Sequence, residues 1–236
     1  MLVRIGLENG FEGRSLAWAL DHPGCFAYGT EGEMALVAMA RAIPEYIAWM
    51  EGHTRSPWFA PADIDIRLVE VWEDYQVDDC YQRVAPGAQG TVVNAWFQND
   101  WQPLTVEDAR HGQQLLAWSR EDLLSAFRDA PAEKIDETLP GERWTIRGIL
   151  AHVSTIQWWL LERLDLAGVP RSALPKDPLE RYEAMYARLA EILPGLAGSE
   201  QVVGKAGEIW SPRKLLRRSV WHQRDHAEHI RKLSAG

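Results

Sequence analysis

Three histidines gather near the end of the sequence, in the segment SVWHQRDHAEHIRKL. They are His222, His226 and His229, three of the seven histidines in the chain. Each residue of an α-helix turns by about 100°, so the three imidazoles would share one helix face. Two imidazoles four residues apart can bind one cation, because side chains at this spacing lie one turn above the other. Polar residues on solvated helices give the same pattern, so the spacing alone leaves both interpretations open.

A zinc-type site needs at least a third ligand, and His152 in LAHVSTIQWWL is the best candidate. His152 lies about seven residues, or about 10 Å, from the start of an expected helix that begins near Thr145. His226 lies about seven residues, again about 10 Å, before Leu233, the expected end of the last helix. The imidazoles would therefore meet at one level if these two helices run antiparallel. The sequence allows that direction without requiring it.

The second half of the sequence has four helical patterns, each with a start signal or a stop signal. Thr105 with Asp108, and Ser211 followed by Pro212, are typical of helix starts. The sequence predicts helices over about 105–129, from 145 to just before Gly168, over about 177–193, and from 211 onward. Four helices of this length are typical of a four-helix bundle.

The first half has shorter apolar runs, typical of strands. Thr30 precedes Glu33 by three positions, which predicts a capping box at the start of a helix that continues to about Met50. The expected strands are 2–7, 14–20, 25–29 and 64–72, so the predicted order is β-β-β-α-β. Residues 76–103 contain one further candidate strand, TVVNAWF. We expect an α+β chain with an N-terminal domain and its linker over 1–100 and a helical domain over 101–236.

Charge is distributed unevenly along the chain, whose formal net charge is −9. Residues 1–100 contain 6 Arg, no Lys and 15 acidic residues, and this acidity argues against nucleic-acid binding. A local basic cluster comprising Arg213, Lys214, Arg217 and Arg218 is interpreted as a solvated helix face. The sequence shows no long apolar run and no signal-peptide pattern, so we expect a cytoplasmic protein without a membrane partner. Two cysteines, Cys25 and Cys80, are expected to be reduced.

The helical half resembles a known family. A Trp-led helix with one histidine (WTIRGILAHV), followed by a later helix with HQRDHAEH, is similar to the DinB/YfiT-like four-helix bundles, over residues 104–236. The resemblance implies an up-down-down-up bundle with a divalent metal, zinc or nickel, at His152, His222 and His226. His229 stands where relatives often have Gln. It is either a fourth ligand, a hydrogen-bond donor to a ligand or a contact for bound substrate.

The N-terminal half resembles a second family. The stretch DHPGCFAYGTEGEMALVAMARAIPEYIAWM is similar to the N-terminal domain of HicB-type antitoxins, over about residues 1–75. The resemblance implies a small α/β fold of the partial RNase-H type that lacks catalytic carboxylates and covers a protein partner. A protein partner for this domain, and a homodimer, therefore stay open as expectations.

Three neutral imidazoles leave a bound metal its full charge and at least one open position, which is typical of catalytic sites. The DinB-like resemblance implies a small-molecule substrate and a low-molecular-weight thiol as cosubstrate, in S-transfer or isomerisation. Asp225 is either an acceptor that orients a ligand imidazole or a surface carboxylate. His111 is interpreted as an ordinary polar residue, and Trp158, Trp159 and Trp221 as core residues or pocket walls. A metal-dependent hydrolase and a non-enzymatic binding module are the alternative functions.

Overall fold

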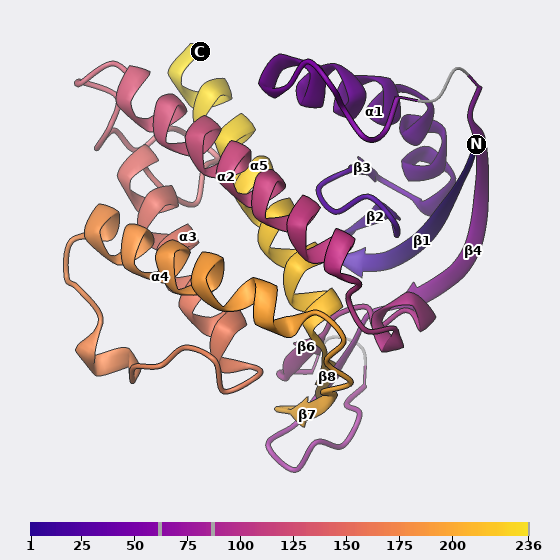
Figure 1. The fold of residues 1–236 in the computed structure, drawn as a ribbon. Coiled ribbons are helices and arrows are strands. Elements are labelled where there is room, and N and C mark those ends of the chain that lie inside the picture. Colours follow the sequence, from indigo (N-terminus) through magenta and orange to yellow (C-terminus); the bar gives the residue numbers. More distant parts are fainter. Residues whose placement is uncertain (61–62, 86–87, 236) are drawn as a thin grey trace. The chain divides into compact units, whose positions relative to one another are not determined.

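The computed structural model describes residues 1–60, 63–85 and 88–235 (Figure 1). Contacts within the chain divide it into two compact units. The first unit contains Met1–Gln102 and Val202–Lys214, and the second contains Pro103–Gln201 and Leu215–Gly236. The first unit is therefore built from two separate segments of the chain. The domain limits 1–100 and 101–236 stay predictions.

The first unit contains a four-stranded sheet with the strand order β3-β2-β1-β4. Strand β1 pairs antiparallel with β2 and parallel with β4, and α1 precedes β4 in the chain. The predicted β-β-β-α-β order and the mixed α+β class are confirmed. The bounds are β1 (Leu2–Phe11), β2 (Arg14–Ala19), β3 (Phe26–Gly29), α1 (Gly32–His53) and β4 (Asp65–Glu73).

The predicted capping box at the start of α1 is wrong. The helix begins at Gly32, and its N-cap residue Glu31 makes no side-chain capping hydrogen bond. Close packing of the first helical turn on the end of β3 explains the difference. A Cβ atom at Gly29 would lie 2.2 Å from the backbone nitrogen of Ala35. The first turn of α1 can therefore pack this closely only because Gly29 has no side chain. This contact, absent from local propensity, sets where the helix starts.

Buried carboxylates hold an irregular segment, Asn94–Phe97, inside the first unit, and a short 3-10 helix, Gln98–Trp101, follows it. Glu208 accepts a hydrogen bond from the backbone nitrogen of Asn94 (2.6 Å), and Glu8 accepts one from Ala95 (2.7 Å). The predicted strand TVVNAWF accordingly ends early, at Val93. Two hairpins of three-residue strands complete the unit, and three of these four strands lack a predicted counterpart because they are too short to show alternation. They are β5 (Tyr75–Val77) with β6 (Thr91–Val93), and β7 (Val203–Lys205) with β8 (Glu208–Trp210).

Three of the four long helices of the second half follow the predicted ranges closely, whereas the one that begins after Thr145 ends at Glu162, about five residues before its predicted end. Thr105 caps the first of them by accepting from Asp108 N, and Thr145 caps the second by accepting from Gly148 N. Ser211 Oγ lies 3.2 Å from Lys214 N, as expected for the cap of the last helix. The bounds are α2 (Val106–Asp129), α3 (Ile146–Glu162), α4 (Pro178–Ile192) and α5 (Pro212–Ala235).

Contacts within the second unit set the directions of its helices. The pairs Ser119–Gln223 and Asp122–Arg231 show that α2 and α5 run in the same direction. Helix α3 runs antiparallel to α5, because its residue 152 lies beside 222 and its residue 157 beside 219. All four helices contribute to one buried cluster. It comprises Leu123, Leu124, Ala126, Ala130, Ile146, Ile149, Leu150, Val153, Tyr182, Ala227, Ile230 and Leu233.

The interpretation of the basic cluster as a solvated helix face is wrong. Lys214 is 0% exposed, Arg217 2% and Arg218 7%, and Arg213 is partly buried. The Lys214 ammonium lies 4.4 Å from the ring centroid of Trp210, within the first unit. The Arg218 guanidinium lies 4.7 Å from the ring centroid of Trp221. Aromatic faces attract cations, which offsets part of the cost of burying them.

No helix in the described part of the chain is long and apolar enough to cross a membrane. Cys25 is buried and Cys80 is exposed, and both are free thiols, as predicted.

Candidate metal centre

The imidazoles of His152, His222 and His226 converge on one point in the second unit. His222 Nε2 lies 3.1 Å from His152 Nε2 and 3.1 Å from His226 Nε2. The candidate ligand atoms of all three residues lie within 4.8 Å of one another. Helix α3 supplies His152, and α5 supplies the other two. The structure therefore brings together the three residues that the sequence proposed as ligands.

Two features of the helices produce this convergence. His222 and His226 stand four residues apart on α5, so their rings lie one above the other. Helix α3 runs antiparallel to α5, which is the direction that the matched depths of His152 and His226 required. The sequence indicated the depths, and the packing of the helices decided the direction.

The three imidazoles are neutral near pH 7. Burial lowers the pKa of His152 to about 4, with a further contribution from the charge of Arg143. Burial lowers the pKa of His226 to about 3, and His152 and His229 add to the effect. The pKa of fully buried His222 lies well below its ordinary value for the same reason, with further contributions from His226 and His152. A neutral imidazole keeps the lone pair that a metal needs.

The geometry fits a divalent cation. Metal–nitrogen bonds of about 2.0–2.1 Å in a tetrahedral site place two ligand nitrogens about 3.3 Å apart. The observed 3.1 Å separations of the Nε2 atoms are close to this value. Among the described residues, no carboxylate or thiolate joins this group of three. Three neutral donors suit zinc or nickel and leave room for at least one further ligand.

Trp144 contacts two of the three imidazoles. Its ring stacks on His152 with a centroid separation of 4.3 Å and meets the edge of His226 at 6.2 Å. The residue immediately precedes Thr145, the N-cap of α3, which places it beside the first turns of that helix. In the sequence this tryptophan is part of the Trp-led helix pattern, which predicts no contact for it. Ring packing by Trp144 therefore restricts the orientation of two candidate ligands.

His229 lies outside the group of three and contacts a carboxylate. Its Nε2 lies 2.9 Å from Glu142 Oε2, and its ring stacks on His226 at a centroid separation of 6.0 Å. The described structure thus places His229 beside a candidate ligand. Glu142 escaped sequence analysis because it sits in a loop 87 positions away from His229. Asp225 is partly buried on α5.

The sequence also drew attention to His111 and to tryptophans of the helical half. His111 Nε2 lies 2.7 Å from an Arg110 nitrogen, and its pKa is lowered by burial and by that arginine. The indole of Trp158 donates to Val169 O at 2.9 Å. Trp221 is buried beside His222, with ring centroids 5.5 Å apart.

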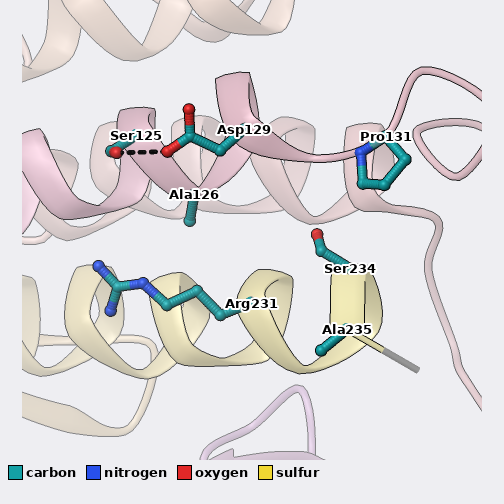
Figure 2. Close-up of a pocket in the computed structure, with 7 residues that line it drawn as sticks. All are labelled: Ser125, Ala126, Asp129, Pro131, Arg231, Ser234 and Ala235. Atoms are coloured by element: carbon teal, nitrogen blue, oxygen red, sulfur yellow. Dashed lines mark hydrogen bonds between the residues drawn. The ribbon is translucent and has the colours of Figure 1, made fainter.

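A separate cavity of about 300 Å³ lies between the last turns of α2 and α5 (Figure 2). Ser125 donates to Asp129 on one wall, and Arg231 extends from the other (Figure 2). None of the three converging histidines lines it. Its lining residues are Ser125, Ala126, Asp129, Pro131, Arg231, Ser234 and Ala235.

One partly buried imidazole on α3 and two buried imidazoles on α5 define a candidate metal centre on two antiparallel helices. Residues 115–230 match the family model of the DinB superfamily, and this range includes all three histidines. The helical part of the chain is therefore DinB-like, which supports a metal-binding protein. The match does not include residues 1–75, so the resemblance to HicB-type domains stays a prediction. No curated protein and no solved structure matched the chain.

Proposed function

We propose that the second unit is a divalent-metal centre that works with a low-molecular-weight thiol, in S-transfer or isomerisation. The observation that carries the proposal is the convergence of three neutral Nε2 atoms, from His152, His222 and His226, on one point. Imidazole suits zinc and nickel, and an open position is typical of catalytic centres. The DinB superfamily match over 115–230 supports the same reading.

The proposal includes an up-down-down-up four-helix bundle. The shared direction of α2 and α5 supports it, as does the opposite direction of α3. Helix α4 runs antiparallel to α2, because Arg120 pairs with Glu183 and Gln113 donates to Ala190 O. In such a bundle, inward-facing side chains of neighbouring helices build the site.

A bound divalent ion would supply positive charge that favours the thiolate form of a thiol over its neutral form. The chain contributes the rest. Burial keeps His152, His222 and His226 neutral, so their lone pairs stay available near neutral pH. Trp144 holds the ring of His152 by stacking, and Glu142 holds His229 beside His226. These residues orient the donors and shield them from water.

Metal analysis followed by an activity assay tests the proposal. We expect the purified protein to bind one zinc or nickel ion per chain, and His152→Ala to lose it. We expect metal-dependent turnover of a generic aryl halide with one of three thiols: mycothiol, bacillithiol or glutathione. Metal binding without binding or turnover of any of these thiols would contradict the transferase. Turnover without thiol would instead identify a hydrolase.

A further inference from the structure

A chain of four buried polar side chains crosses the second unit beside the candidate metal centre. Ser119 Oγ donates to Gln223 Oε1 (2.9 Å), and Gln223 Nε2 donates to Gln157 Oε1 (3.2 Å). Gln157 Nε2 in turn donates to Ser219 Oγ (3.3 Å). All four residues are at most 2% exposed. The chain therefore links α2, α3 and α5 by directional hydrogen bonds inside the protein.

A buried polar network of this kind contributes little net free energy to folding, so a benefit other than stability is expected. Burying an amide costs free energy that one hydrogen bond roughly offsets, and apolar side chains of similar size often stabilise as well or better. The best-attested benefit of a buried polar contact is that it selects one register between helices. The buried cluster of this unit consists of Leu, Ile, Val, Ala and Tyr side chains, so the amides of Gln157 and Gln223 differ from it in polarity.

The position of the network relates it directly to the metal ligands. On α5, Ser219 and Gln223 stand one turn apart and enclose His222 in the sequence. On α3, Gln157 contacts both of them, so its amide is held between two points of the opposite helix. His152 lies on the same helix, five positions earlier.

Sliding α3 by one residue along α5 would move His152 by about 1.5 Å. That shift is large against a metal–nitrogen bond of about 2.0–2.1 Å, so one step of register would break the site. An apolar interface tolerates small shifts of one helix along the other. The Gln157 amide, by contrast, can keep its hydrogen bonds to both Ser219 and Gln223 at one position only. We infer that Gln157 and Gln223 are positioning residues, which set the height of His152 against His222 and His226. This inference rests on the proposed metal centre and is independent of the thiol chemistry.

The test replaces both amides by apolar groups and follows the metal rather than activity. In Q157L/Q223L, Ser119 keeps an acceptor, because its hydroxyl also lies 2.8 Å from Leu115 O. We expect the variant to fold and its cobalt(II) affinity, measured by chelator competition, to fall at least about tenfold, as when groups that orient ligands are removed. We also expect the ligand-field spectrum of bound cobalt(II) to change. Wild-type affinity with a wild-type spectrum would overturn the inference.

Two further variants complete the design. Q157N shortens the side chain by one methylene and keeps it polar, so it replaces the double variant if that one does not fold, with the same expected loss and spectral change. S154A is the matched control, because Ser154 is equally buried on α3 and accepts a hydrogen bond from Arg181 of α4 (2.8 Å). We expect S154A to lower thermal stability and leave cobalt(II) affinity unchanged. Absence of metal from wild type would instead refute the proposed function.

Discussion

The surroundings of Glu8 in the first unit and of the three converging histidines in the second unit are opposite. In the first unit, Glu8 is fully buried and both its oxygens accept hydrogen bonds, from Trp18 Nε1 (2.8 Å) and Ala95 N (2.7 Å). In the second unit, the Nε2 atoms of two buried histidines and of the partly buried His152 face one another. A buried carboxylate that accepts hydrogen bonds from N–H donors is fully paired within the protein. Imidazole nitrogens that face one another can instead bind a cation with their lone pairs. The surroundings of a buried polar group therefore distinguish a structural role from a binding role.

The largest expected effect concerns Glu8, the buried carboxylate to which we assign a structural role. Glu8→Ala leaves two buried N–H donors without their acceptor, and we expect it to lower the free energy of unfolding of the first unit by about 4 kcal/mol. Chemical denaturation followed by tryptophan fluorescence measures the change. Glu12→Ala is a suitable control, since Glu12 is exposed and its pair with Arg14 spans 3.8 Å. If Glu8→Ala is as stable as the control, the acid does not hold the Asn94–Phe97 segment.

For the histidines we expect the opposite result, a large loss of metal affinity and a small loss of stability. His222→Ala removes a ligand from a three-ligand site, and we expect zinc affinity to fall more than about 100-fold, beyond the range seen for groups that only orient ligands. The metal-free protein should lose little stability. Chelator competition measures the affinity, with His111→Ala as the control. A strongly destabilised metal-free variant would assign His222 a structural role and break the comparison.

Acid should weaken the metal-free second unit. In the unfolded chain the histidines titrate near their ordinary pKa of about 6.5, whereas burial lowers those of His152 and His226 to about 4 and about 3. Between these values the unfolded state binds more protons, so stability falls as the pH drops from about 6.5 toward 4. Thermal melts of metal-free protein across this range measure the slope. A His152→Gln/His226→Gln variant should show a weaker dependence of stability on pH. An unchanged slope would show that these two histidines do not cause the loss of stability in acid.

The smallest expected effect concerns Trp144, which orients the imidazoles without donating to the metal. Trp144→Leu removes the stack on His152 and the edge contact with His226, so we expect a loss of about tenfold in zinc affinity. Isothermal titration measures it, with Trp158→Leu as the matched tryptophan control. A loss as large as that of His222→Ala would show that Trp144 does more than orient a ring.

Local signals explain which parts of the structure were predictable. Thr105 and Thr145 cap α2 and α3 as expected, because a hydroxyl reaching the third backbone N–H is a short-range interaction. The start of α1 was not predictable, since Gly29 sets it through a contact between elements. The burial of Arg217 and Arg218 was missed for the same reason. Charged residues at helical spacing look the same in sequence whether the helix face is solvated or packed.

By itself, the sequence determined the helices of the second half, the face that His222 and His226 share, and the depth of His152 in its own helix. These follow from the 100° turn and the 1.5 Å rise per residue, which act over a few positions. Only the tertiary structure decided that α3 runs antiparallel to α5, that Trp144 and Glu142 adjoin the imidazoles, and that Gln157 meets Gln223. Those pairings join residues far apart in the chain, and they depend on how whole helix faces pack.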